Sequence, residues 1–340
     1  MRIGILSSGG DCPGINATIR GVGKAALTYG MEVIGIIDGF AGLMHNEHIE
    51  LGERQLSGIL TLGGTILGTS REKPFKKKEG DVIADKPQLI KQNCVKMGLD
   101  CLVCIGGNGT QKTASQLAEI GINVVGIPKT IDNDVWGTDI TFGFDTAVNI
   151  ATEAIDRLHS TANSHKRVMV IELMGHHAGW ITLYAGVAGG GDVILIPEIE
   201  HNIEKVNEVL LHRAHKGKPY SIVVVSEGVK TGKKDGTASG VGAHIAEQIE
   251  KGTKIETRVT VPGYTLRGGS PSPLDRIIAT RMGTYAASLI HKQQFGTMVA
   301  IHDNEMRSVS LKEVGGKTRL VPHDHYLIRQ AKRVGTFFGD

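Results

Sequence analysis

The 340-residue sequence has few aromatic side chains, nearly balanced charges and no long apolar run. Lys and Arg total 38 and Asp and Glu total 35, which leaves a net charge of +3. A general nucleic-acid or membrane-surface binder would carry a clear basic excess or stripe, so we expect neither partner. No stretch reaches the ~18–20 apolar residues that a membrane span needs. The start, MRIGILSSGG, has no charged-then-apolar export signal.

The sequence has only four cysteines, Cys12, Cys94, Cys101 and Cys104. Cys101 and Cys104 have the spacing of a zinc-binding pair. However, they lie in the apolar run CLVCIGG, where side chains three residues apart point to opposite faces of a strand. We interpret them as buried strand residues rather than metal ligands. Reduced thiols and the missing export signal predict a cytoplasmic location.

Glycine, in contrast, is abundant, with 46 residues, and 40 % of the chain is hydrophobic. The glycines follow no collagen-like or low-complexity period, so they indicate tight turns and close approaches of the backbone to a ligand. The apolar content exceeds what one hydrophobic core usually holds, which predicts two domains.

Short Val, Ile and Leu runs alternate with amphipathic stretches, which is typical of parallel sheets covered by helices on both faces. The expected strands are 2–8, 32–37, 101–107, 123–128, 167–173, 193–197, 221–227 and 298–302, and the expected helices lie near 17–29, 86–97, 110–120, 144–161, 203–215, 241–251 and 273–292. We therefore predict an α/β protein of two interleaved doubly wound domains with mainly parallel sheets. The expected larger domain comprises residues 1–138 with 259–305, and the smaller one 139–258 with 306–340.

Polar, glycine-rich segments follow four of these strands: SSGGDCPG, GGNGTQK, KTIDND and MGHHAGW. Because ligands of open α/β sheets bind at the carboxyl edge, these loops could converge on one cleft. IGGNGTQK opens a helix, where glycines and backbone amides suit a phosphate, although a plain strand-to-helix turn would have the same pattern. Neither the Walker A spacing nor GxGxxG occurs, so a dinucleotide-dependent dehydrogenase is not favoured.

The segment PKTIDND carries two carboxylates two residues apart, Asp132 and Asp134. Close acidic groups suit a general base working beside Mg²⁺, while the alternative is a polar loop that caps the next helix. Arg267, in LRGGSP, is typical of a guanidinium that a rigid turn holds for a phosphate. Arg71, Arg167 and Arg258 are further candidates.

An ordered set of segments resembles the 6-phosphofructokinase family, in its phosphofructokinase A type and mixed-substrate branch. It comprises GGDCPGIN, DGFAGL, GGTILGTSR, IGGNGT, PKTIDND, SHKRVMVIELMG, SEG and ETRVTVPGYTLRGGSPSPLDR, in the family's order. The resemblance implies Mg²⁺-dependent phosphoryl transfer to the 1-hydroxyl of fructose 6-phosphate in glycolysis. It also implies a homo-oligomer, expected to be a tetramer, whose sites are shared between subunits.

The resemblance also implies a role for individual residues. Asp132 would be the general base, with Thr130 and Asp134 beside it, and Arg71 would stabilise the transferring phosphoryl group. The donor site would comprise Gly10, Arg71, Glu72, Gly107, Asn108, Gly109 and Thr110. The sugar-phosphate site would comprise Thr130, Ile131, Asp132, Met174, Gly175, His176, Glu227, Tyr264 and Arg267, with Arg167 and Arg258 reaching in from a neighbouring subunit.

Three positions depart from the family pattern. Asn108 replaces an Asp that helps to bind magnesium, so the metal would rest more on Asp132 or Asp134. His176 replaces an Arg, which removes a bidentate phosphate donor. Tyr264 replaces a His, as in the branch that includes pyrophosphate users.

The phosphoryl donor depends on two positions. The resemblance implies that pyrophosphate users carry an Asp where this chain has Gly109. A carboxylate there would crowd and repel the α-phosphate of ATP, whereas glycine leaves room for it. Lys129, in contrast, matches the pyrophosphate users. We weight the steric argument more heavily and expect ATP, with pyrophosphate as the alternative. A non-catalytic, sugar-phosphate-binding regulatory subunit is the second alternative, favoured by Asn108 and His176. Related ketose phosphates remain possible acceptors.

An effector site is a further expectation from the resemblance. Arg20, Lys24, Lys216 and Lys218 match its basic residues, with Asp192 as a possible metal-binding acid and His159 in place of an Arg.

Overall fold

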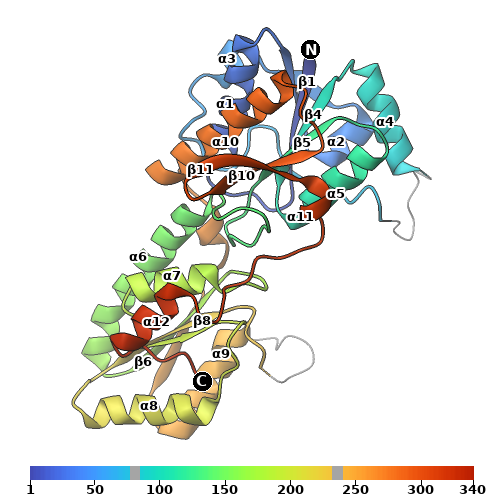
Figure 1. The fold of residues 1–340 in the computed structure, drawn as a ribbon. Coiled ribbons are helices and arrows are strands. Elements are labelled where there is room, and N and C mark those ends of the chain that lie inside the picture. The colour runs from blue at the N-terminus through green and yellow to red at the C-terminus, as the bar shows by residue number, and fades with distance from the viewer. Residues whose placement is uncertain (77–84, 232–239) are drawn as a thin grey trace. The chain divides into compact units, whose positions relative to one another are not determined.

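The computed structural model describes residues 1–76, 85–231 and 240–340. The chain forms two compact units (Figure 1). Unit 1 comprises Met1–Thr130, Asp134–Asp145 and Arg267–Arg319, and unit 2 comprises Ile131–Asn133, Thr146–Leu266 and Leu320–Asp340. The chain passes between the units repeatedly, so the domains are interleaved. The last three passages follow residues 145, 266 and 319, whereas the sequence places them after residues 138, 258 and 305.

The described residues of unit 1 form a seven-stranded sheet in the order β11-β10-β5-β4-β1-β2-β3. Its strands are β1 (Arg2–Ser8), β2 (Glu32–Ile36), β3 (His48–Glu50), β4 (Cys101–Gly106), β5 (Val124–Pro128), β10 (Thr297–His302) and β11 (Glu305–Ser310). Pairing is parallel from β2 through β1, β4 and β5 to β10, and the two edge strands are antiparallel. The carboxyl ends of β1, β4 and β5 therefore meet at one edge.

Helices cover both faces of this sheet. They are α1 (Ile15–Thr28), α2 (Phe40–His45), α3 (Glu53–Leu56), α4 (Lys86–Lys96), α5 (Asn108–Glu119), α10 (Pro273–His291) and α11 (Leu311–Val314). Figure 1 shows α1 and α10 packed side by side on one face, with α2, α4 and α5 on the other. Leu6, Leu102 and Cys104 of the sheet join the second group in a buried apolar core.

Unit 2 has a smaller, wholly parallel sheet in its described residues, in the order β7-β8-β6-β9. Its elements are α6 (Phe144–His165, which begins at the end of unit 1), β6 (Val168–Leu173), α7 (Trp180–Ala188), β7 (Val193–Leu195), α8 (Ile203–His215), β8 (Ser221–Ser226), α9 (Gly240–Thr253), β9 (Thr257–Thr260), the 3₁₀ helix η1 (Gly263–Arg267, which ends in unit 1) and α12 (Tyr326–Arg333). Val170, Val223 and Ile249 belong to the core between the sheet and α8 and α9. None of the described helices is both long and apolar enough to cross a membrane.

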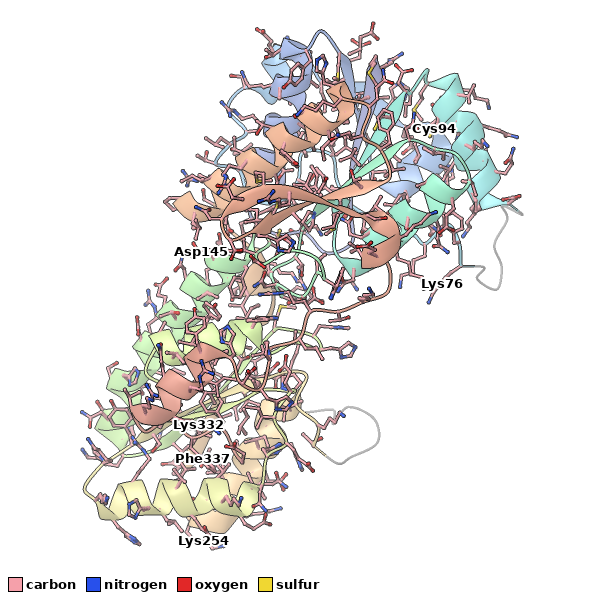
Figure 2. The ribbon with its side chains drawn as sticks, viewed as in Figure 1. Lys76, Cys94, Asp145, Lys254, Lys332 and Phe337 are labelled. Atoms are coloured by element: carbon pink, nitrogen blue, oxygen red, sulfur yellow. The ribbon has the colours of Figure 1, made fainter. Side chains whose placement is uncertain are left out.

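The start of α6 is fixed within unit 1. Ser272 Oγ donates a hydrogen bond to Asp145 Oδ2 at 2.5 Å, and Figure 2 labels Asp145 among the described side chains. Ser272 also caps α10, because its hydroxyl accepts from the Asp275 amide. One serine therefore ties two helix starts together.

Every strand expected from an apolar run is present, with ends that differ by a residue or two. The missed strands β3, β9 and β11 are short or mainly polar, so they lack a continuous apolar run. β11 returns from β10 through Asp303 and Asn304, whose φ values of 49° and 64° are typical of a two-residue hairpin turn. This hairpin keeps residues 305–310 in unit 1, whereas the expected boundary placed residue 306 onward in the smaller domain.

All four cysteines are buried. Cys101 and Cys104 lie in β4, opposite Ile3 and Leu6 of β1, as expected of strand residues. Burial raises the pKa of the Cys12 thiol to about 12 and that of Cys94 to about 11. These thiols are therefore protonated at neutral pH and poor nucleophiles.

Candidate active site

The loop after β1 is held in place by the segment that ends at Arg71. Ser8 and Ser70 form a parallel bridge, the Gly9 amide donates to the Ser70 carbonyl at 2.9 Å, and Thr69 Oγ1 donates to the Gly9 carbonyl at 2.7 Å. Gly9 has a φ of 89°, which favours glycine. Arg71 follows Ser70 directly and is exposed, so it lies beside this loop.

Glu72, an expected donor-site residue, forms an ion pair with Lys86. Its carboxylate lies 2.9 Å from Lys86 Nζ, and the two side chains are 21 % and 8 % exposed. Lys86 begins α4. The pair therefore anchors the segment that carries Arg71 to a helix of unit 1.

Lys129 supports the same loop from the end of β5. The side chain is buried, and Nζ donates to the carbonyl oxygens of Gly10 and, at 3.3 Å, Ser8. Thr110 Oγ1, from the start of α5, donates to the Ser8 carbonyl at 3.3 Å. Residues that follow three different strands thus meet at one loop, as the sequence predicts for SSGGD, GGNGT and PKT.

Arg267 also contacts this loop, although it lies more than 250 residues away in the sequence. Its NH1 donates to the Asp11 carbonyl at 3.3 Å. A Cβ atom at Gly10 would lie only 2.9 Å from that same nitrogen. Within the described part of the chain, the buried Nε of Arg267 has no hydrogen-bond partner. The absence of a side chain at Gly10 therefore leaves space for the Arg267 guanidinium group.

Asn108 begins α5 and faces Asp134. Its Nδ2 donates to the Asp134 carbonyl at 3.1 Å and to Oδ2 at 3.0 Å, and the Arg319 amide donates to the Asp134 carbonyl at 2.8 Å. An Asp at position 108 would place two carboxylates at this distance, which is unfavourable unless a cation lies between them. Asn108 thus fixes the Asp134 carboxylate without repelling it.

The same pair offers oxygen ligands. The Oδ1 atom of Asn108 is buried and lacks a hydrogen-bond partner among the described residues. Across those residues, no group of three or more His, Cys, Asp or Glu side chains could hold a metal ion. Any cation here would therefore take few protein ligands, which is how Mg²⁺ usually binds beside substrate phosphates.

The remaining residues of PKTIDND are well ordered by local contacts. Thr141 Oγ1 donates to the Thr130 carbonyl at 2.8 Å, and Asn133 has a φ of 52°. Ile131 is fully buried, and Asp132 is 8 % exposed. Gly109, in contrast, is exposed, and a Cβ atom there would meet no other atom within 4 Å. A small side chain at position 109 would therefore not clash with any other atom of the protein.

In unit 2, two carboxylates hold the turn after β6. Glu227 Oε1 accepts from the amides of Gly175 at 3.2 Å and His176 at 2.9 Å. Both carboxylate oxygens of Glu198 accept from the Gly179 amide, at 3.0 and 3.1 Å. His176 is exposed with a φ of 53°, and the partly buried Met174 precedes the turn. Glu227 was identified from the sequence, but Glu198 was missed. The only sequence signal for Glu198 was its position as an acidic residue shortly after β7.

Arg167 and Arg258 lie at the opposite end of this sheet. Arg167 precedes the six residues of β6 and Met174 follows them, so their Cα atoms are about 23 Å apart at ~3.3 Å per residue. Arg258 lies on β9 beside Met169, near the same amino end. The chain therefore does not bring these arginines to the turn held by Glu227. Tyr264, in η1, is 76 % exposed.

Both arginines bind Glu256, a residue that sequence reasoning missed. Arg167 Nε donates to Glu256 Oε2 at 2.5 Å, and Arg258 NH2 donates to Oε1. The hydrogen bond from Arg167 lowers the pKa of the Glu256 carboxyl. The sequence signal for this contact was the spacing of two residues between Glu256 and Arg258, which places both side chains on the same face of an extended segment.

Two residues expected in an effector site make contacts within unit 2. Asp192 Oδ1 lies 2.5 Å from Arg213 NH2, and Oδ2 accepts from the Ile222 amide at 2.9 Å. Burial nevertheless raises the pKa of Asp192, because desolvation outweighs these contacts. His159 bonds to the Gly189 carbonyl at 2.6 Å and to Tyr220 Oη at 3.1 Å.

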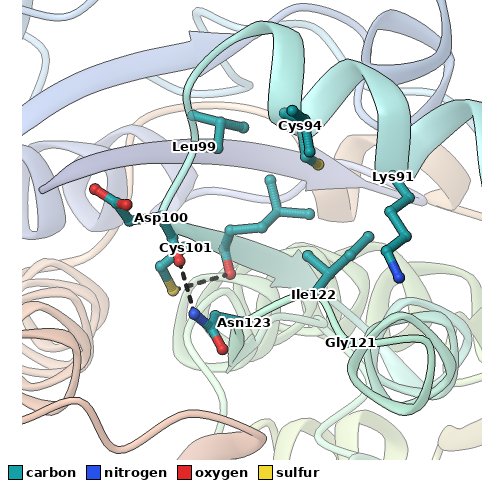
Figure 3. A pocket seen from close by; sticks show the side chains of 10 residues that line it. Lys91, Cys94, Leu99, Asp100, Cys101, Gly121, Ile122 and Asn123 are labelled. Carbon is teal, nitrogen blue, oxygen red and sulfur yellow. Dashed lines mark hydrogen bonds between the residues drawn. The ribbon is translucent and has the colours of Figure 1, made fainter.

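Unit 1 also contains a pocket (Figure 3). It has a volume of about 120 Å³ and is lined by Lys91, Cys94, Val95, Leu99, Asp100, Cys101, Leu102, Gly121, Ile122 and Asn123. Cys101 begins β4 and Asn123 precedes β5, so the pocket lies at the amino ends of these strands. The loops that the sequence singles out follow the carboxyl ends.

Comparison with known proteins agrees with this arrangement. A family model described as Phosphofructokinase matches residues 2–290. The ATP-dependent 6-phosphofructokinase 3 of Bacteroides thetaiotaomicron is 61 % identical over 342 residues and covers 100 % of both chains. The pyrophosphate–fructose 6-phosphate 1-phosphotransferase of Dictyoglomus thermophilum is 44 % identical and covers 99 % of both.

A solved structure extends the likeness to the fold. The pyrophosphate-dependent phosphofructokinase of Nitrosospira multiformis has a TM-score of 0.86 at 22 % identity, covering 100 % of this chain and 92 % of that one. At this identity, the match supports the two interleaved α/β units and nothing about substrates. The family match and the full-length relatives go further, and the chain belongs to the phosphofructokinase family.

Proposed function

We propose that this protein is an ATP-dependent 6-phosphofructokinase. It transfers a phosphoryl group from ATP to the 1-hydroxyl of fructose 6-phosphate and gives fructose 1,6-bisphosphate, a glycolytic reaction that we place in the cytoplasm. The observation that carries the proposal is the meeting of Lys129, Thr110 and Arg267 at the loop Ser8–Asp11, in a chain whose full-length relatives carry this name.

The donor phosphates would bind between the Ser8–Asp11 loop and the start of α5. The first amides of a helix lack partners within it and carry partial positive charge, so Gly107–Thr110 suits a phosphate. Open space at Gly109 leaves room for the nucleotide. Lys129 is turned toward the carbonyls of Ser8 and Gly10, and we assign it to shaping the loop.

We assign the chemistry to Asp132 and Arg71. An Asp132 carboxylate that accepts the proton of the sugar 1-hydroxyl makes that oxygen a better nucleophile. The exposed Arg71 guanidinium would stabilise negative charge on the transferring group, which is where catalysis of this reaction mostly lies. Thr130 would orient the sugar beside them.

The oxygens of Asn108 and Asp134 fit a magnesium ion. A buried amide oxygen without a hydrogen-bond partner and a fixed carboxylate are hard ligands of the kind Mg²⁺ prefers. When bound, the ion would offset charge on the donor phosphates. Asn108 would keep the Asp134 carboxylate aimed at that position, and Asp132 would remain available as the base.

In this proposal, the sugar and its phosphate group bind at opposite ends of the unit 2 sheet, in two different copies of the chain. We place the sugar against Gly175, His176 and Glu227, with Arg267 as a further ligand, and its phosphate against Arg167 and Arg258 of a second copy. The ~23 Å between Arg167 and Met174 supports this division, since fructose 6-phosphate is too short to reach both in one chain. The active assembly is accordingly a homo-oligomer, and the family resemblance favours a tetramer.

Subunit complementation is expected to reveal this shared site. Asp132→Asn and Arg258→Ala homo-oligomers should each be nearly inactive at low fructose 6-phosphate. Co-expressed with two different tags and purified as hybrids, they should regain activity, because some sites combine an intact Asp132 with an intact Arg258 from another chain. Hybrids with no more activity than the parents would place both residues in one chain's site.

Gly10→Ala is expected to impair catalysis and leave the fold intact. The new Cβ would meet only the flexible end of Arg267, so stability should fall by less than about 1 kcal/mol. The guanidinium must move, and kcat/KM for fructose 6-phosphate should fall roughly tenfold. Steady-state kinetics and thermal melting check both effects. The matched control is Gly52→Ala, where the nearest atom lies 3.4 Å from the new Cβ and kcat/KM should stay unchanged.

Product analysis tests the proposed function. Purified protein with ATP, Mg²⁺ and fructose 6-phosphate should form fructose 1,6-bisphosphate and ADP in equal amounts, and parallel reactions with other ketose phosphates should be slower. A faster reaction with another sugar phosphate would reassign the acceptor. No product with ATP or pyrophosphate would favour the regulatory-subunit alternative.

A further inference from the structure

Glu256 lies between the two arginines at the amino end of the unit 2 sheet. Arg167 directly precedes β6 and Glu256 directly precedes β9. In these parallel neighbours Val168 faces Thr257, and the Val168 amide donates to the Glu256 carbonyl at 3.0 Å. The backbone pairing therefore fixes Glu256 next to Arg167, and Arg258 follows two residues later on the same side of the extended chain.

The carboxylate divides its oxygens between the two guanidinium groups. Oε2 binds Arg167 Nε and Oε1 binds Arg258 NH2. Arg258 NH1 also donates to the Thr257 carbonyl at 3.0 Å, which further restricts this side chain. The Arg167, Glu256 and Arg258 side chains are 27 %, 39 % and 52 % exposed. Ion pairs this exposed add little to stability, so the main effect of the bridge is orientation.

Orientation matters because two unbridged guanidinium groups repel each other and adopt many rotamers. One carboxylate between them leaves a net charge of +1 and holds both forks at the same end of the sheet. In the described residues, the Arg167 side chain uses only Nε in hydrogen bonds, so its two terminal nitrogens can bind an anion. A planar fork with two parallel donors matches the oxygens of a phosphate monoester.

We propose that Glu256 is a positioning residue that aligns Arg167 and Arg258 for the phosphate group of the sugar phosphate bound by a second copy. The inference rests on the proposed function and deepens it. Glu256 does not touch the substrate in this account. It acts through the arginines, and its removal affects sugar-phosphate affinity and not the transfer step.

The test compares Glu256→Gln with wild type in the intact oligomer. Gln keeps the shape and one acceptor oxygen but removes the charge that binds both arginines. The KM for fructose 6-phosphate should rise roughly threefold to tenfold, while kcat at saturating sugar and the KM of the donor change less than about twofold. Glu247→Gln removes the same charge from a surface pair with Lys251 on α9 and should change nothing.

A second comparison separates positioning from a general structural role. In an Arg258→Ala background, Glu256→Gln should raise the KM by a smaller factor, because one of its two partners is already missing. A structural defect would instead add the same factor in both backgrounds. An unchanged KM, or a lower one, would overturn the proposal, since a lower KM means that Glu256 competes with the phosphate.

Calorimetric binding of fructose 6-phosphate distinguishes this inference from the proposed function. Wild type that binds the sugar phosphate but does not phosphorylate it would contradict the function, while weaker binding by Glu256→Gln would still support the positioning role. If Glu256→Gln fails to assemble, Glu256→Asp serves instead. It keeps the charge on a shorter side chain, and an increase in the dissociation constant is the expected result, with an unchanged constant overturning the proposal.

Discussion

Asp132→Asn should lower kcat by roughly 10²- to 10⁴-fold, the range typical of losing a general base. The amide has nearly the same shape as the carboxylate but cannot take the proton of the sugar 1-hydroxyl. Because Asp132 is already almost buried, the substitution should not alter the surface or the oligomer. Steady-state kinetics with ATP and fructose 6-phosphate should show a KM for the sugar within about threefold of wild type.

The control for this prediction is Asp139→Asn, the same chemical change at a half-exposed residue that binds His302 and the Asp303 amide. Its kcat should match wild type. A loss of less than about tenfold in Asp132→Asn would exclude Asp132 as the base. A higher KM for fructose 6-phosphate with an unchanged kcat would indicate that Asp132 binds the sugar and does little in the chemical step.

Gly109→Asp should change the choice of donor. A Cβ at position 109 meets no other atom, and an Asp near the start of α5 suits the helix dipole, so folding should be unaffected. A carboxylate about 4 Å from the α-phosphate costs on the order of 1–4 kcal/mol, depending on exposure to water. We expect kcat/KM for ATP to fall at least about tenfold, with the pyrophosphate rate spared or raised.

Gly109→Ala is the matched control, since it adds the Cβ without the charge. Its kcat/KM for ATP should fall much less than that of Gly109→Asp. Equal losses in the two variants would mean that crowding, not charge, excludes ATP. Equal losses with both donors would mean that position 109 does not select the donor, and Lys129 would then be the residue to test.

The fold was predictable wherever strands are continuous apolar runs. β1, β4, β5, β6 and β8 are buried on both faces, so their sequences carry a strong signal. β11 is an edge strand and four of its six residues are polar, so the Asp303–Asn304 turn was the only sequence signal for it. The hairpin extends unit 1 beyond residue 305, so the last passage between the units follows residue 319.

The sequence was enough to predict which loops form the candidate site, but not which side chains contact one another there. Parallel pairing of β1, β4 and β5 brings their polar carboxyl-end loops together, and this follows from the pattern. That Lys129 turns toward the carbonyls of Ser8 and Gly10, or that Arg267 reaches Asp11, depends on side-chain directions set by tertiary packing. Glu198 and Glu256 were missed because a single acidic residue beside a strand is usually a solvated charge.

The most direct test of this account is a comparison of donors with the wild-type protein. Initial rates are measured with fructose 6-phosphate and Mg²⁺, using saturating ATP in one series and saturating pyrophosphate in the other. We predict a rate with ATP at least about tenfold higher, because Gly109 leaves space for the nucleotide. A higher rate with pyrophosphate would contradict the proposal and show that Lys129 outweighs the open space at Gly109.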